Sequence, residues 1–120
     1  MFVIIKKKRK NIIKERIMLP KTLVDERKTG DICKIFQMLS DYKRLRIVLE
    51  LIKGELCVSE LTGICGGEQS TVSHQLRVLR DNKIVSARRI GRTVKYAIAD
   101  EHVRLIVETA ICHTSCKVEK

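Results

Sequence analysis

Side chains that bind metals are concentrated near the end of the chain. Two of the three histidines and two of the five cysteines fall within residues 102–116. Imidazole nitrogen, thiolate sulfur and carboxylate oxygen are the ligands that Zn(II) takes in proteins. We therefore expect a metal site on this segment, with four candidate ligands: Asp100, His102, His113 and Cys116.

Helical geometry places these candidates at two ends of one line. At ~100° per residue, His102, His113 and Cys116 fall within about 40° of one line along a helix. A non-helical start can bring the Asp100 carboxylate beside His102, and residues three apart, such as His113 and Cys116, can chelate together. The two histidines, however, are ~16 Å apart along the axis, whereas zinc ligands lie ~2.0–2.3 Å from the metal. One helix cannot complete the site, but two antiparallel copies can, with two four-ligand sites at a symmetric interface.

Apolar residues at helical spacing predict two helices that precede this segment. The helix over 31–40 is expected to carry one buried stripe, formed by Ile32, Ile35, Phe36 and Leu39. Ser40 or Asp41 can cap the helix over 42–52. The inward-facing residues expected in this second helix are Leu45, Val48, Leu49 and Ile52.

The middle of the chain predicts a third helix, a fourth helix and a hairpin. The third helix starts within 55–65 and is broken by the Gly66-Gly67 pair. The fourth, within 68–83, turns Val72, Leu76 and Leu79 to one side. A hairpin with arms 84–88 and 93–98 follows, with Gly91 in its turn. A final helix is expected from about 100 to 117.

Length and charge indicate one domain that binds a polyanion. The chain has 120 residues and a formal net charge of +11, which favours a partner such as nucleic acid. Residues 1–21 hold eight Lys/Arg and one Glu, and residues 70–95 hold seven Lys/Arg and one Asp. We expect residues 1–21 to be a basic tail, disordered or partly helical, with Met18 as an alternative start. Residues 22–120 form the folded domain.

Several classes of protein are excluded or disfavoured by the sequence. No export signal precedes the domain, and no apolar run approaches the ~20 residues needed to span a bilayer. We therefore expect a cytosolic protein without a membrane partner, whose cysteines are thiols or ligands rather than disulfides. A zinc ribbon is excluded because there is no C-x-x-C pair. An enzyme is disfavoured because no phosphate loop, paired acids or nucleophile–base arrangement is present.

The order of the elements predicts a mostly α-helical winged helix-turn-helix with a β-hairpin wing. A DNA major groove admits one helix, whose short polar side chains can contact base edges. A basic hairpin tip can reach a neighbouring phosphate strand or the minor groove. The candidate DNA-binding residues are Gln69, Ser70, Ser73, His74, Arg77, Arg88, Arg89 and Arg92.

Two stretches resemble the ArsR/SmtB family of metal-responsive bacterial repressors. They are LSDYKRLRIVLELIKGELCVSEL and QSTVSHQLRVLRDNKIVSARRIGRTVKYAI, and the resemblance covers about residues 31–116. One departure is Glu68, which stands where many members have a serine cap. The resemblance implies a homodimer, built through the first and last helices, that binds a roughly palindromic operator in double-stranded DNA. It also implies that metal binding weakens the DNA complex.

The residues distinguish between two metal sites known in that family. Sensors of arsenic, lead or cadmium carry a pattern resembling ELCVCDL, but this chain reads ELCVSEL, with Ser59 in place of the second thiol. Cys57 is therefore expected to be a small buried or half-buried residue. The last-helix ligands match the family's zinc-type site residue by residue, except that Cys116 replaces the usual Glu or His. We expect Zn(II) as the effector, with Co(II), Ni(II) or Cd(II) possible.

Two alternatives remain open at this point. A thiol-based redox or sulfide sensor of the same fold would use Cys33 with Cys112 or Cys116. A constitutive DNA-binding protein would use no effector.

Overall fold

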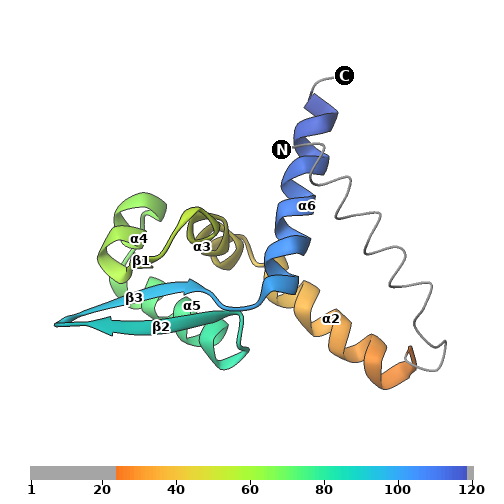
Figure 1. Ribbon diagram of the computed structural model, residues 1–120, viewed down its shortest axis with the longest axis horizontal. Coiled ribbons are helices and arrows are strands. Elements are labelled where there is room, and N and C mark those ends of the chain that lie inside the picture. Colours follow the sequence, from red (N-terminus) through yellow and green to blue (C-terminus); the bar gives the residue numbers. More distant parts are fainter. Residues whose placement is uncertain (1–23, 119–120) are drawn as a thin grey trace.

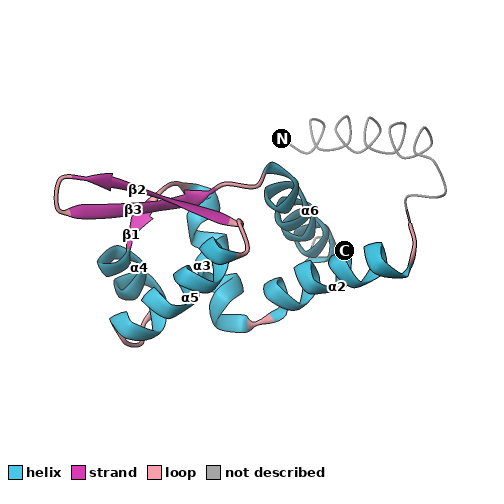
Figure 2. Cartoon of the chain, turned by 90° about the horizontal axis from the view of Figure 1, so that it is seen from below, coloured by secondary structure: helices cyan, strands magenta, loops and turns pink. Residues whose placement is uncertain are grey.

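The computed structural model describes residues 24–118, so the basic tail predicted at residues 1–21 lies outside the described residues. The elements in chain order are α2 (Glu26–Ser40), α3 (Tyr42–Lys53), β1 (Leu56–Cys57), α4 (Val58–Cys65), α5 (Gln69–Asp81), β2 (Val85–Ile90), β3 (Thr93–Ile98) and α6 (Glu101–Val118). We call residues 42–98 the body. Helices α2 and α6, the outer pair, lie on the side of the body away from the hairpin tip (Figures 1 and 2). The predicted winged helix-turn-helix is confirmed.

Short polar side chains set where the first helices begin. The Asp25 carboxylate accepts a hydrogen bond from the Lys28 backbone N–H at 2.8 Å and caps α2, which starts five residues earlier than the apolar pattern indicates. The Asp41 carboxylate caps α3 by accepting from the Arg44 N–H at 3.0 Å. Glu68 precedes α5 and its side chain does not cap the helix. This agrees with its standing where many family members have a capping serine.

The sheet contains one strand that the sequence did not predict. Its order is β1-β3-β2, with all neighbours antiparallel. Leu56 and Cys57 pair with Tyr96 and Lys95, so the expected helix over 55–65 begins only at Val58. The pairing partners lie about forty residues away, and a local helical pattern cannot reveal them. The wing, which is β2, β3 and their turn, closes at Gly91, whose φ of 63° favours glycine.

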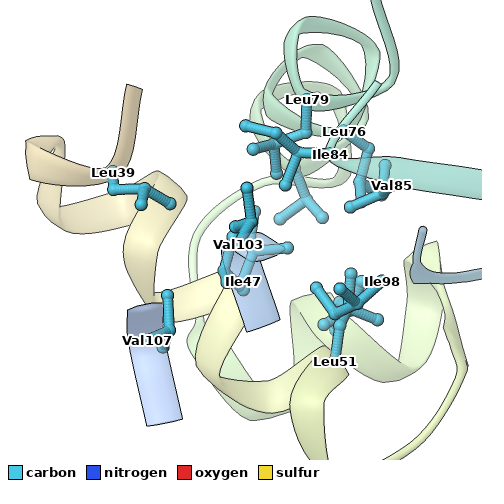
Figure 3. Packing of buried hydrophobic residues seen from close by; sticks show 13 residues of the cluster. Leu39, Ile47, Leu51, Leu76, Leu79, Ile84, Val85, Ile98, Val103 and Val107 are labelled. Atoms are coloured by element: carbon cyan, nitrogen blue, oxygen red, sulfur yellow. The ribbon is translucent and has the colours of Figure 1, made fainter. Parts of the chain in front are cut away.

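The core lies mainly within the body (Figure 3). Val72, Leu76 and Leu79 of α5 are buried, as predicted, and so is Val48 of α3. Leu45, Leu49 and Ile52 are only half-buried. The most buried α3 residues besides Val48 are Ile47 and Leu51, each one position before an expected residue. The fully buried side chains are Ile47, Val48, Leu51, Leu61, Leu76 and Leu79.

The prediction that the apolar stripe of the first helix is buried is wrong for a single chain. Ile32, Ile35 and Phe36 are 41%, 37% and 55% exposed, and only Leu39 is buried. Helix α2 meets the body through its C-terminal end and projects away from it (Figure 1), so the described residues leave the rest of the stripe only partly covered. None of the described helices is long and apolar enough to cross a membrane.

Candidate DNA-binding face and metal-ligand helix

Helix α5 turns its predicted DNA-binding side chains to solvent. Gln69, Ser70, Ser73, His74 and Arg77 are all exposed, whereas the opposite side of the helix is in the core. The chain enters α5 through Gly66 and Gly67, whose φ angles of 79° and 85° disfavour other residues. The arrangement presents short polar groups and one guanidinium, which suits contact with base edges in a major groove.

The position of α5 is fixed by an arginine that the sequence did not single out. The Arg44 Nε–H of α3 donates to Gln75 Oε1 of α5 at 3.0 Å. The same guanidinium contacts Met38 Sδ of α2 and lies 3.6 Å from Asp41 Oδ2. Arg44 therefore joins three helices, and no sequence signal marks a pair 31 residues apart.

The three predicted wing arginines differ in their surroundings. Arg88 pairs with the Glu55 carboxylate, and the Arg89 Nε–H donates to the Gly91 carbonyl at 3.2 Å. Arg92 is exposed and makes no ion pair within the described residues. Arg92 is thus the wing guanidinium most available to a phosphate.

A second ion pair holds the base of the wing to α4. Lys95 Nζ of β3 lies 2.7 Å from Glu60 Oε1, which also accepts from the Cys57 backbone N–H at 3.0 Å. The Lys95 ammonium, followed by the Cys57 N–H, lowers the pKa of Glu60 from 4.5 to about 2. In return, the Glu60 carboxylate raises the pKa of Lys95. Both side chains are partly exposed, so this pair orients the wing more than it stabilises the fold.

At the start of α6, the structure brings together the first two predicted ligands. Asp100 Oδ1 accepts hydrogen bonds from the backbone N–H groups of His102 at 2.8 Å and Val103 at 3.2 Å, and so caps the helix. The same oxygen lies 3.6 Å from His102 Nδ1, and the His102 side chain is 96% exposed. A carboxylate and an imidazole therefore share the first turn.

The other two predicted ligands lie toward the opposite end of α6. His113 is exposed and Cys116 is half-buried. No group of three or more His, Cys, Asp or Glu side chains gathers within the described residues. The four donors are of the types that form tetrahedral metal sites. Two lie at each end of α6, and one chain does not bring the two pairs together.

The remaining cysteines are dispersed. All five are free thiols, with Cys33 exposed on α2 and Cys112 half-buried on α6. Cys57 is half-buried, as predicted, and its Sγ lies 3.1 Å from the Ser59 hydroxyl rather than from a second thiol. Burial raises the pKa of Cys65.

An apolar groove of about 350 Å³ runs between α2, α3 and α6. Phe36 lies on its α2 side, and Ile106 and Ile111 lie on its α6 side. These three side chains are 55%, 37% and 40% exposed. Together with Ile32 and Ile35 they form what we call the outer apolar surface.

Comparison with known proteins places this architecture in a family. The family model described as "Bacterial regulatory protein, arsR family" matches residues 41–87. A cadmium resistance transcriptional regulatory protein, a CadC homolog of Staphylococcus aureus, is 40% identical over 84 residues, which are 69% of each chain. The chain belongs to the ArsR family. The HTH-type transcriptional regulator NmtR of Mycobacterium tuberculosis is 38% identical over 95 residues, or 79% of each chain.

Solved structures of ArsR-like proteins share the fold. The antimony-specific transcriptional repressor AntR superposes with a TM-score of 0.74 at 30% identity, covering 82% of this chain and 89% of that one. A homodimeric winged helix-turn-helix DNA-binding domain of Mycobacterium bovis has a TM-score of 0.64 at 25% identity and covers 78% and 92%. The ArsR family consists of DNA-binding transcriptional regulators, and this chain is one of them and not an enzyme.

Proposed function

We propose that this protein is a homodimeric transcriptional repressor that leaves its operator when a metal ion binds between the two α6 helices. Zn(II) is the proposed effector, with Co(II), Ni(II) and Cd(II) as alternatives. The observation that carries the proposal is the distribution of donors on α6. Asp100 and His102 share the first turn, and His113 and Cys116 lie eleven or more residues later.

The outer apolar surface supports a dimer through α2 and α6. Apolar side chains exposed on two helices that border one groove favour association with another protein surface. A two-fold interface presents the same patch on both chains. If the two α6 helices pair antiparallel, Asp100 and His102 of one chain face His113 and Cys116 of the other. The M. bovis domain of the same fold is described as homodimeric.

The donor set supports a borderline metal. One carboxylate, two imidazoles and one thiolate suit tetrahedral Zn(II) or Co(II), and the thiolate also suits Cd(II). A cation bound by ligands from both chains would crosslink the two α6 helices. Asp100 already orients the helix start with its Oδ1, so its Oδ2 is the oxygen we assign to the metal. Ligation requires neutral imidazoles and a thiolate, and the response is expected to fade as the pH falls.

The body supplies the DNA-binding half of the proposal. In a dimer, two α5 helices would enter successive major grooves ~34 Å apart, and the wing arginines would lie along the phosphates. A change in the pairing of the α6 helices alters this spacing, with a coupling free energy that is typically ~1–3 kcal/mol. The named relatives include a cadmium resistance regulator and an antimony-specific repressor, which supports a metal as effector.

Co(II) titration of the reduced protein tests the site. We expect intense ligand-field bands and a thiolate charge-transfer band that saturate at about one metal per chain. Cys116→Ser should remove the charge-transfer band, whereas Cys112→Ser, on the same helix, should retain it. A weak octahedral spectrum would contradict the tetrahedral site.

DNA binding tests the regulatory role. His102→Ala and His113→Ala should bind DNA as the wild type does in metal-free buffer but should not be released by Zn(II) in a fluorescence anisotropy assay. If these variants lose metal-free binding, the ligand role is wrong.

A thiol-based response is the second candidate. Cys33 is exposed on α2, and Cys112 and Cys116 are half-buried on α6, so oxidation would act on the same two helices. Release of DNA by mild oxidant, lost in Cys33→Ser, would favour it over metal. Affinity indifferent to both metal and oxidant would indicate a constitutive DNA-binding protein.

A further inference from the structure

One side chain of α6 is bonded directly to the body. Arg104 Nη1–H donates to the Ile52 carbonyl at 3.2 Å. Within the described residues, it is the only hydrogen bond that joins α6 to another helix or strand. Arg104 is 29% exposed and also lies 3.7 Å from Glu101 on its own helix. The rest of the attachment is apolar, through Val103 and Val107.

The accepting carbonyl occupies a sensitive place in the body. Ile52 lies in the last turn of α3, where carbonyl groups lack partners within the helix and attract a cation. Three residues later, Glu55 pairs with Arg88 of the wing, and Leu56 of β1 pairs with Tyr96 of β3. Two separate contacts therefore connect the residues just after α3 to the wing.

Arg104 also lies within one turn of the proposed ligands at the start of α6. Its backbone N–H donates to the Asp100 carbonyl at 3.0 Å, and His102 is two residues before it. The contact with the Ile52 carbonyl and two of the proposed ligands therefore lie within one turn of the same helix.

We propose that Arg104 is the positioning residue through which α6 sets the orientation of the wing. It is not one of the proposed DNA-binding or metal-binding residues, and it acts through the end of α3, β1 and the Glu55–Arg88 pair. The effect of Arg104 on metal-dependent release of DNA rests on the proposed function. Its effect on the orientation of the wing does not, because it can be measured in the metal-free chain.

Three variants separate this role from general stability. Arg104→Met removes the donors and the charge but keeps an unbranched apolar stem. Arg104→Lys keeps a charge and a donor and should restore part of the effect. Glu101→Gln is the matched control, because it removes the ion pair to Arg104 and leaves the Ile52 contact intact.

Hydrogen exchange of the metal-free protein is the first measurement. In Arg104→Met we expect amide exchange in residues 55–57 and 85–98 to accelerate about fivefold, with α5 unchanged. Glu101→Gln should exchange like the wild type. Wild-type exchange in β1 and the wing of Arg104→Met would overturn the positioning role, and so would acceleration spread evenly over the body.

DNA affinity with and without Co(II) is the second measurement. The probe is a duplex selected from a randomised pool by the metal-free wild type. In Arg104→Met, Co(II) binding should be unchanged, while the ratio of the two Kd values should fall at least about fivefold toward one. A full wild-type ratio in Arg104→Met overturns the inference and leaves the proposed function standing. If the wild-type protein has the same Kd for DNA with and without Co(II), the proposed metal response is wrong. The hydrogen-exchange data then still decide whether Arg104 positions the wing.

Discussion

The body closes its own core, whereas the outer pair keeps much of its apolar surface open. All six fully buried large side chains lie in α3, α4 and α5, and the ion pairs Glu55–Arg88 and Glu60–Lys95 attach the wing to the residues around β1. Helix α2 buries only Leu39, and the outer apolar surface faces outward. The DNA-binding half is thus complete in one chain. Within the described residues, the half with the proposed ligands leaves apolar side chains of α2 and α6 exposed, which suits a surface that a second chain covers.

The largest expected effect comes from removing a side chain from the core of the body. Ile47 is 2% exposed and Ile90 is 47% exposed, so the same substitution can be made in both environments. Ile47→Ala should lower the free energy of unfolding by about 2–5 kcal/mol, because it leaves a cavity. Ile90→Ala should change it by about 0.5 kcal/mol or less. Urea denaturation measures both values, and equal losses would mean that the wing is as tightly packed as the core.

The second test places a charge on the outer apolar surface. Phe36→Glu should raise the dimer dissociation constant about 100-fold, because a carboxylate would have to be buried without a partner. The fold of each chain should persist, since Phe36 is 55% exposed there. Sedimentation velocity and far-ultraviolet circular dichroism measure the two properties. Tyr42→Glu is the control, because Tyr42 is 77% exposed on the body, and a dimer lost equally in both variants would contradict an interface at α2 and α6.

The sequence predicted the body better than the outer pair, for a physical reason. Periodicity identifies a helix and its apolar side, and in α5 that side has a core to pack against within the same chain. In α2 the same periodicity identifies a real stripe, but the described residues leave Ile32 and Phe36 largely exposed. Strand β1 was missed because two residues carry no periodicity, and only their pairing with β3 defines them as a strand.

The candidate site was predictable in its residue types but not in its connections. The polar face of α5 and the donors of α6 follow from spacing on single helices. Arg44 and Arg104 do not, because their partners lie 31 and 52 residues away. For Arg104 the partner is a backbone carbonyl, which has no signature in the sequence. Asp100 was predicted as a ligand, and its additional role as the cap of α6 emerges only from the backbone geometry.

A smaller effect distinguishes two arginines within the wing. Arg92→Ala should lower the slope of log Kd for DNA against log salt by about 0.9, the value for one phosphate contact. Arg88→Ala should lower it less, because Glu55 already neutralises part of that charge. The slopes come from anisotropy titrations over a series of salt concentrations. Equal changes in both would indicate that the Glu55 pair opens when DNA binds.

The smallest expected effect concerns acid, which should loosen the body at the Glu60–Lys95 pair. Because the pKa of Glu60 falls from 4.5 to about 2 on folding, the pair stabilises the fold fully above pH 4.5. This stability is lost as the pH falls from 4.5 through about 2. The difference in Tm between wild type and Glu60→Gln should therefore be positive near pH 6 and vanish near pH 2. A difference that persists at pH 2 would mean that the contribution of Glu60 does not come from its charge.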